Sequence, residues 1–357
     1  MTVRKLAGVT AVANVIVVAI GLVVLAVLPS ADSGGAGRVK APARPRLPVA
    51  TLPAPVPATV ESARKVQANE LGKVPVLMYH RIQRKRSASI DRTPAQLKAE
   101  LEKLATRGFV PITAAEFVAG AIDIPAGSHP VVLTFDDGNP THFALDASGL
   151  PKKDTAVGII YDVAAKHPSF RPVATFWVNR EPFGLTDEAQ QAAAVRWLLE
   201  HGFEVANHSY GHPDLRRLTA KQVKEQIVRQ ERLLKKFGVP SSTTFALPFG
   251  SQPGKRSLAQ KGSWDGTSYK FDGVFLAGAE PSVSPFHEDF DRRAIQRIQS
   301  NGTAGDCRKW CSTYWLEWFK KHPGELYTAD GDPDSLSLPK QRHGDIGSKR
   351  PKRVIEY

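Results

Sequence analysis

Short apolar runs alternate with segments of helical periodicity from about Gly72 onward. The runs are rich in β-branched residues, and runs of this length and kind are typical of buried strands. We predict strands at Val74–Tyr79, Val131–Phe135, Val173–Val178, Phe203–Ala206, Thr243–Leu247 and Gly273–Leu276. This alternation of strands and helices predicts an α/β fold with mostly parallel strands. Six or seven such units, a number estimated from the pattern, fit an incomplete or distorted (β/α) barrel better than a two-layer sandwich.

Three predicted helices begin with a capping box, in which a threonine and a glutamine or glutamate three residues later satisfy free N–H groups. These boxes start at Thr93, Thr113 and Thr219. The last one opens the clearest helix of the chain. Its apolar residues recur at helical spacing: Val223, Ile227, Leu234 and Phe237. Gly238 is placed to end this helix.

The N-terminus departs from this pattern. After two basic residues, an uncharged apolar run extends from Leu6 to Leu28, which is long enough to span a bilayer as a helix. Positive charge before the run favours an orientation that places the rest of the chain outside the cytoplasm. A cleaved signal peptide is the alternative, because small residues follow the run at Ser30, Ala31 and Ser33. Both interpretations predict an extracytoplasmic protein, either anchored in the cell membrane or secreted.

The sequence from Pro29 to about Val66 is rich in Pro, Ala, Gly and Val, a composition typical of an extended spacer. We therefore divide the chain into a signal anchor or signal peptide (1–28), a Pro/Ala-rich linker (29–71), a globular domain (72–325) and a basic C-terminal tail (326–357). The content of 42% hydrophobic and 23% charged residues is ordinary for a domain that buries a core.

The net charge of +13 suits an anionic cell envelope better than nucleic acid. The sequence has no basic-aromatic stacking motif and no zinc-finger spacing, so we expect no nucleic-acid partner. Its two cysteines, Cys307 and Cys311, favour a local structural disulfide in an oxidising compartment.

Polar residues follow several predicted strands directly, which is where barrel enzymes carry their catalytic groups. The run Val131–Phe135 ends in Asp136, Asp137 and Gly138. Neighbouring side chains on an extended backbone point apart, so we expect one aspartate to bind a metal and the other to act on a proton. A plain polar turn is the alternative, because Asp-Gly is common in turns.

Two further strand ends add to this picture. His208 and His212 follow the run Phe203–Ala206 at a spacing that lets both face one ion, and imidazole suits zinc and its neighbours. With one aspartate they supply three ligands and leave a position open, as catalytic metal sites do. The third strand runs into Pro248-Phe249-Gly250, a turn that can direct a backbone N–H at a developing oxyanion.

Four motifs in the order TFDDG, ATFWV, NHSYGH and LPFG resemble the polysaccharide deacetylase family, the NodB-homology domain of carbohydrate esterase family 4. The resemblance covers roughly Lys73 to Asn301. The opening VPVLMYHRI is similar to the branch related to poly-N-acetylglucosamine deacetylases. The fold that this resemblance implies is a distorted (β/α) barrel of about seven strands, in agreement with the alternation described above.

The resemblance also implies a role for each motif residue. Asp136 would be the general base, and the N–H of Phe249 would help to hold the oxyanion. Asp137, His208 and His212 would bind a divalent metal, most often Zn²⁺, with Co²⁺ and Ni²⁺ as alternatives. The implied activity is metal-dependent removal of acetyl groups, above all N-acetyl groups of N-acetylglucosamine units, from a cell-envelope or extracellular polysaccharide.

The chain departs from the family pattern in its second half. The family's C-terminal histidine motif is missing from the segment Ala294–Ser300, and Ala246 stands where an arginine often precedes the turn. Both departures are familiar in the poly-N-acetylglucosamine branch. His80 and Arg297 are then candidates for the proton donor or for residues that support the base. The alternative for His80 is a hydrogen-bonded structural histidine.

Aromatic residues offer weaker signals. Trp177, Tyr210 and Trp264 are candidates for stacking on sugar rings, and Trp197 is expected in the core. The stretch Trp310–Phe319 is typical of a closing amphipathic helix. Two other functions stay open: a catalytically silent glycan-binding module on a membrane stalk, and a hydrolase of another class such as an amidase. The presence of both aspartates and both histidines favours the deacetylase.

Overall fold

The structure, a computed structural model, describes residues 47–302, 309–348 and 353–357. In this part of the chain one eight-stranded sheet runs in the order β10-β1-β3-β4-β5-β6-β9, with β2 paired to the first half of β3, and all its neighbours are parallel. Its strands are β1 (Val76–Tyr79), β2 (Phe109–Ile112), β3 (His129–Phe135), β4 (Thr175–Val178), β5 (Glu204–Asn207), β6 (Thr244–Ala246), β9 (Gly273–Phe275) and β10 (Ile298–Gln299). Two small sheets add β7 (Lys261–Trp264) with β8 (Thr267–Lys270), and β11 (Ser335–Leu338) with β12 (Arg353–Glu356).

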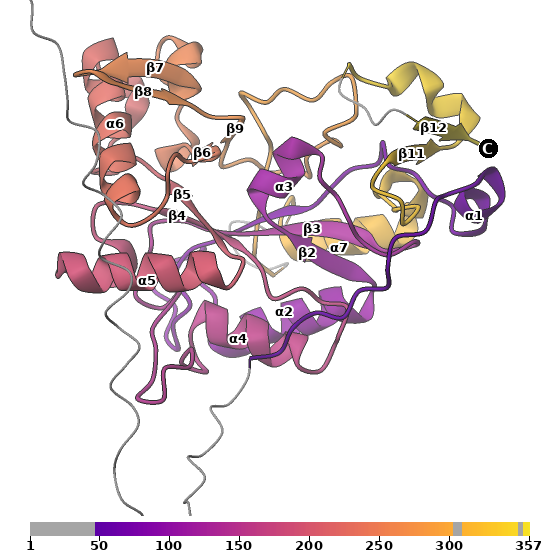
Figure 1. The fold of residues 1–357 in the computed structure, drawn as a ribbon, viewed down its shortest axis with the longest axis horizontal. Helices are drawn as coiled ribbons and strands as arrows, with labels where there is room; N and C mark the ends of the chain where they lie inside the picture. The colour runs from indigo at the N-terminus through magenta and orange to yellow at the C-terminus, as the bar shows by residue number, and fades with distance from the viewer. Residues whose placement is uncertain (1–46, 303–308, 349–352) are drawn as a thin grey trace, which may run out of the picture. The chain divides into compact units, whose positions relative to one another are not determined.

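Helices cover the sheet, as Figure 1 shows with α2, α4 and α5 on one face and α3 on the other. The α-helices are α1 (Val60–Lys65), α2 (Pro94–Thr106), α3 (Ala114–Ala119), α4 (Ala156–Ala164), α5 (Glu188–Glu200), α6 (Ala220–Lys236) and α7 (Ser312–Lys321). The three predicted capping boxes at Thr93, Thr113 and Thr219 are all formed. Each threonine side chain accepts a hydrogen bond from the backbone N–H of the third helical residue, and each threonine backbone N–H donates to the side chain of that residue.

The sheet curls until both of its ends meet on one short segment. Ile298 of β10 pairs with Leu77 of β1, and three residues earlier Ile295 forms a parallel bridge to Phe275 of β9. The curled parallel α/β fold expected from the sequence is therefore confirmed. The six predicted strands are all present, shifted by one or two residues at their ends.

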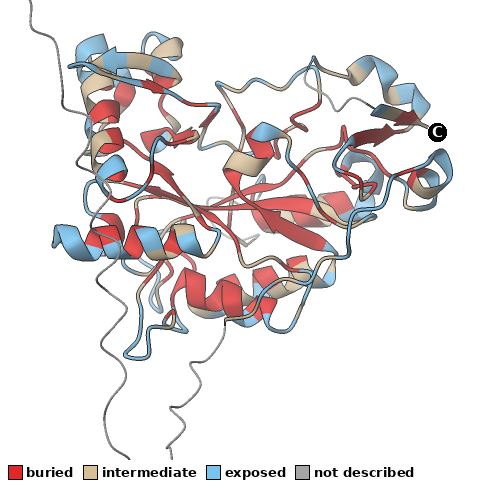
Figure 2. Ribbon diagram, in the orientation of Figure 1, coloured by how far each residue is buried: buried red, intermediate tan, exposed pale blue. Residues whose placement is uncertain are grey.

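Alternation along the strands divides the core into an inner and an outer set, and the strands are buried on both faces (Figure 2). In β3, Val131, Leu133 and Phe135 pack outward against the helices, whereas Val132 belongs to the inner cluster with Trp177. Because side chains alternate with a period of two, residues at even positions of β3 face inward. This register points Asp136, the residue after β3, into the barrel.

Segments outside the predicted core domain also pack on it. Thr51 donates its N–H to the carbonyl of Pro168, and Ala58 donates to the carboxylate of Asp332, so residues 47–59 lie along the domain (Figure 1). Part of the segment 326–357, expected from the sequence as a basic tail, is folded. There β11 and β12 pair in parallel, and Leu336, Leu338 and Ile355 are buried together with Ser335 and Ser337.

The expected N-terminal anchor or signal peptide lies outside the described residues, as does Cys307 of the expected disulfide. Across residues 47–302, 309–348 and 353–357, none of the helices combines the length and the apolar character that crossing a bilayer requires.

The loop after β1 has its own scaffold at the carboxyl edge of the sheet. The carboxylate of Asp91, which is fully buried, accepts hydrogen bonds from the backbone N–H groups of Ser87 and Ala88 and from the side chains of Gln83 and Arg81. Burial acts to raise the pKa of Asp91, but these hydrogen bonds lower it to about 2. The ionised carboxylate therefore holds the loop together.

We predict that Asp91→Ala lowers the free energy of unfolding by about 2 kcal/mol at pH 7. The ionised carboxylate of Asp91 has a lower pKa in the folded than in the unfolded state and so stabilises the fold, and the variant lacks this contribution. The folded pKa is the lower one, so this contribution is complete above about pH 4 in the wild type and is lost as the pH falls through about 2. Urea unfolding followed by circular dichroism measures both effects. Asp146→Ala is the control, since Asp146 makes similar turn contacts on an exposed loop. Equal midpoints for Asp91→Ala and the wild type at pH 7 would contradict the prediction.

Candidate active site

The two adjacent aspartates reach one site by different backbone conformations. Asp136 continues the inward register of β3 and its side chain is only 4% exposed. Asp137 would face outward on an extended chain, but its φ of 75° turns its side chain back toward the same site, where it is 41% exposed. The following Gly138 also has positive φ, and a Cβ there would lie 3.0 Å from Val178. The tight turn thus gives the two carboxylates different surroundings.

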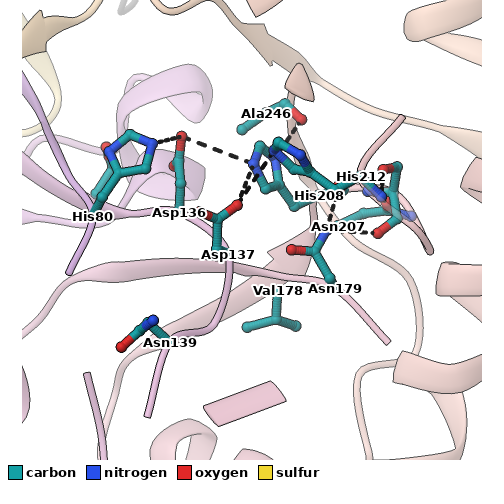
Figure 3. A network of polar contacts seen from close by, with 12 residues as sticks. His80, Asp136, Asp137, Asn139, Val178, Asn179, Asn207, His208, His212 and Ala246 are labelled. Carbon is teal, nitrogen blue, oxygen red and sulfur yellow. Dashed lines mark hydrogen bonds and ion pairs between the residues drawn. The ribbon is translucent and has the colours of Figure 1, made fainter. Parts of the chain in front are cut away.

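The two histidines stand opposite Asp137, as Figure 3 shows. The Nε2 atom of His208 lies 3.4 Å from Oδ1 of Asp137, and the Nε2 atom of His212 lies 3.3 Å from the same oxygen. His208 follows β5 in the inward register, and His212 reaches the site through left-handed backbone at Ser209 and at His212 itself. The side chain of Asn179 holds this turn by donating to the carbonyls of His208 and Ser209.

These three residues fit a divalent metal. One ligand atom from each of Asp137, His208 and His212 lies within 4.8 Å of the others, and no other such cluster of three or more occurs in the described part of the chain. The Nδ1 atom of His208 is 2.8 Å from the carbonyl oxygen of Ala246, which fixes the ring and directs Nε2 into the site. Two imidazoles, one carboxylate and an open side match the donor set of a catalytic zinc centre.

Arg297 binds the carboxylate of Asp136 with both of its terminal nitrogens. Nη1 lies 2.7 Å from Oδ1 and Nη2 lies 2.8 Å from Oδ2, and neither side chain is appreciably exposed. The Nε atom of Arg297 donates to the carbonyl of Leu276 at 2.5 Å, and the guanidinium carbon lies 5.0 Å from the ring centre of Trp177. The arginine is therefore held on three sides and fixes the orientation of Asp136.

These contacts set the charges of the site. Burial acts to raise the pKa of Asp136, but the charges of Arg297 and His208 and the hydrogen bonds from Arg297 together outweigh it, so the pKa lies well below its usual range. Burial likewise acts to raise the pKa of Asp137, and the hydrogen bond and charge of His208 lower it to about 2. Both aspartates are therefore ionised at neutral pH. Burial lowers the pKa of His212, which leaves that imidazole neutral, as a metal ligand must be.

His80 faces the other side of Asp136. Its Nε2 atom lies 3.9 Å from Oδ2 of Asp136, and that oxygen is 4.0 Å from Nε2 of His208. The Nδ1 atom of His80 is buried and has no hydrogen-bond partner among the described residues. Burial lowers the pKa of His80. Oδ2 of Asp136 therefore lies between His208 of the metal triad and the neutral His80.

Phe249 lies in the turn after β6 with a φ of 56°, and its ring centre is 4.5 Å from that of His212. The turn is tight, because a Cβ on Gly250 would lie 2.8 Å from the backbone nitrogen of Ala277. The structure thus brings all seven site residues predicted from the sequence to the same edge of the sheet: Asp136, Asp137, His208, His212, Phe249, His80 and Arg297.

Other predictions from the sequence are corrected. Trp177 cannot stack on a sugar, since it is fully buried inside the barrel and donates to the hydroxyl of Thr244. The guanidinium groups of Arg229 and Arg232 lie over the rings of Tyr210 and Trp264, at 4.0 and 5.4 Å from the ring centres, and both side chains are half-buried, so sugar stacking by these two rings stays a prediction. Arg297 cannot supply a proton either, because a guanidinium does not deprotonate in proteins.

A cavity of about 830 Å³ lies away from the site, where Phe109 and His129 begin β2 and β3. In a parallel sheet the amino ends of the strands form the edge opposite their carboxyl ends. The aspartates and histidines follow carboxyl ends, so this cavity does not belong to the same site.

Comparison with known proteins agrees with this geometry. Residues 123–262 match the family described as polysaccharide deacetylase. The chain is 30% identical over 197 residues to a chitooligosaccharide deacetylase of Bradyrhizobium sp. (strain ANU 289). This alignment covers 54% of the chain and 72% of the relative.

Solved structures of similar fold include a polysaccharide deacetylase proposed for Bacillus anthracis, with a TM-score of 0.48, 21% identity and coverage of 63% of this chain and 64% of that one. Another is IcaB from Ammonifex degensii, with a TM-score of 0.46, 19% identity and coverage of 71% and 98%.

The matched residues include both aspartates, both histidines and Phe249, but neither His80 nor Arg297. The Bradyrhizobium relative, which is 30% identical and is matched over 72% of its length, decides the assignment to a family. This chain belongs to the polysaccharide deacetylase family and is an enzyme of that family.

Proposed function

We propose that the chain is a metal-dependent hydrolase that removes N-acetyl groups from N-acetylglucosamine units of a cell-envelope or extracellular polysaccharide. The observation that carries the proposal is the convergence of Asp137, His208 and His212 beside the buried, ionised Asp136. The name of the Bradyrhizobium relative, a chitooligosaccharide deacetylase, supports N-acetylglucosamine as the sugar. The apolar run Leu6–Leu28 supports export and attachment to the cell membrane.

Asp137, His208 and His212 would hold the cation. A divalent ion such as Zn²⁺ supplies Lewis acidity there, which polarises the acetamide carbonyl and makes a nearby water more acidic. The hydrogen bond from His208 to Ala246 keeps its ring from rotating when the ion binds or leaves. Asp136 stays out of this ligand set, because Arg297 occupies both of its oxygens.

Asp136 would accept the proton of the attacking water at Oδ2. This oxygen lies 4.0 Å from Nε2 of His208 in the triad, and its hydrogen bond with Nη2 of Arg297 leaves another lone pair for the proton of the water. Since Arg297 fixes the carboxylate plane, the base needs no reorientation during the reaction. The N–H of Phe249 would donate to the carbonyl oxygen as negative charge develops on it.

His80 would deliver a proton to the departing amine. It lies 3.9 Å from Oδ2 of Asp136, so a proton accepted there is next to its Nε2 atom. An amine is a poor leaving group unless it is protonated, and a positioned imidazole is a common donor. The side chain is 17% exposed, which leaves one edge of the ring open to a substrate.

The metal assignment predicts zinc binding that depends on the triad. We expect about one Zn²⁺ per wild-type chain, and at least about a hundredfold weaker binding for His208→Ala or His212→Ala, because each removes one of three ligands. Zinc content after equilibrium dialysis measures this without reference to activity. His343→Ala is the matched control, since the side chain of His343 is 67% exposed. Unchanged zinc content in both triad variants would refute the assignment.

The role of Asp136 predicts that Asp136→Asn releases acetate from N-acetylglucosamine oligomers at least about a hundredfold more slowly than the wild type. Zinc content should be retained, because Asp136 is not a ligand. Thermal unfolding checks that the variant folds, since the asparagine leaves the buried Arg297 without its counter-charge. Asp289→Asn, at a side chain 76% exposed, is the control. Wild-type turnover by a folded Asp136→Asn protein would exclude Asp136 as the base.

The role of His80 predicts a dependence on the leaving group. His80→Gln should lower kcat for the acetamide by about a hundredfold or more, but should lower kcat for 4-nitrophenyl acetate much less, because a nitrophenolate departs without a proton. Parallel assays of acetate release and of nitrophenolate absorbance measure the two rates. Equal losses on both substrates would show that His80 only supports the fold of the site.

A further inference from the structure

The cavity at the amino ends of β2 and β3 lies on the edge of the sheet opposite the metal triad. Its volume of about 830 Å³ is within the range of ligand pockets. The turn after α1, the end of α7 and Tyr357 after β12 all line it. The hydroxyl of Tyr357 donates to the carbonyl of Ala68 at 2.9 Å, and α1 and β12 lie side by side (Figure 1). Segments from distant parts of the sequence therefore enclose a space that can hold a small molecule.

The lining of this cavity favours an anion. Arg107, His129 and Lys320 line it, and none of the lining side chains is a carboxylate. Within the described residues, neither Arg107 nor Lys320 forms an ion pair. The carboxylate of Glu317 on α7 is paired with Lys103 instead, at 2.6 Å. Its charge reaches the two cations of the cavity only from beyond ion-pair distance. A negatively charged ligand would therefore meet positive charge that is only partly compensated.

Arg107 is held with one edge of its guanidinium group unoccupied. Nη1 donates to the carbonyl of Leu316 at 2.8 Å, and the guanidinium carbon lies 5.8 Å from the ring centre of Phe109. Nε and Nη2 have no hydrogen-bond partner in the part of the chain that the structure describes. These two nitrogens form the fork that binds a carboxylate or a phosphate through parallel hydrogen bonds. Basic residues at helix ends often only offset the helix dipole, but that role does not require a guanidinium fixed on two other elements.

His129 adds an acceptor to these donors. Its Nδ1 atom is 2.8 Å from the carbonyl oxygen of Tyr327, which can only accept, so Nδ1 carries the proton. Burial lowers the pKa of His129, so the ring is neutral at pH 7 and Nε2 keeps its lone pair. The cavity thus combines cationic donors, which suit an anionic group, with an acceptor that suits a hydroxyl group.

We propose that this cavity is a second binding site, for a polyol or sugar that carries a phosphate group. The fork of Arg107 and the ammonium group of Lys320 bind the phosphate oxygens. A hydroxyl group of the ligand donates to His129, and its carbon chain packs on Phe319 and Leu326. Two cations from separate elements suit the oxygens of a phosphate, which point in several directions, better than a planar carboxylate. The site is independent of the proposed reaction, because the aspartates lie at the opposite edge.

The test is isothermal titration of the zinc-loaded protein with glycerol 3-phosphate at low ionic strength, where charge contacts are least screened. Arg107→Ala and Lys320→Ala should each raise the Kd at least about tenfold, because each removes a charged hydrogen-bond donor. Arg217→Ala is the matched control, since it removes the same charge from a side chain that is 85% exposed and outside the cavity. Lys320 is also exposed, so Lys320→Ala tests the site even if Arg107→Ala unfolds. No saturable binding by the wild type, or equal Kd values for the three variants, overturns the site.

Two comparisons separate this site from the metal centre and define its ligand. His212→Ala should bind glycerol 3-phosphate as tightly as the wild type, whereas lost binding would place the phosphate on the metal and overturn the proposal. Glycerol 3-phosphate should bind at least about tenfold more tightly than inorganic phosphate, and equal affinities would overturn a polyol phosphate as the ligand.

Titration with a poly(glycerol phosphate) chain distinguishes the two sources of this ligand. Tighter binding than that of the monomer, weakened in Lys320→Ala, supports a polyol-phosphate polymer. Weaker binding than that of the monomer supports a free polyol phosphate.

Discussion

The bidentate ion pair between Asp136 and Arg297 is the interaction on which the rest of the site depends. A carboxylate at the mouth of a closed sheet loses most of its hydration, and it stays ionised only beside a cation held in good geometry. Arg297 meets this requirement because β10 pairs with β1 while the residues before it bridge to β9. The segment that closes the sheet is therefore the one that places the charge, so the curl of the fold and the state of the base share one cause.

Backbone strain is concentrated at the same edge. Four residues around the site have positive φ although they are not glycines: Asp137, Ser209, His212 and Phe249. Each costs stability relative to an extended or helical conformation. The strain at Asp137 has a visible result, because it turns a side chain that the strand register would point outward into the metal site. Adjacent aspartates thereby serve one centre in two different environments.

Much of this site follows from local sequence pattern. Strand register and strand ends suffice to place Asp136, His208 and Phe249 at one edge, and the six predicted strands carry most of the sheet. Arg297 could only be named as a candidate, because its partner is 161 residues away and β10 has two residues, too few to show a period. Trp177 was misjudged for a related reason. The sequence pattern of a strand does not show whether its tryptophan faces solvent or the barrel interior, where Trp177 contacts Arg297 and Thr244.

The same ion pair bears on the missing acid of this family member. In the proposed reaction, a carboxylate whose pKa is held low by Arg297 is a weak base, so it depends on a water already made acidic by the cation. Once protonated, however, Asp136 is a correspondingly strong acid that gives up its proton readily. The nearest acceptor on the side away from the triad is His80, at 3.9 Å. A neutral imidazole in that position can accept the proton and donate it to the departing amine. Arg297 therefore makes Asp136 a weaker base for the water and, once protonated, a stronger acid toward His80.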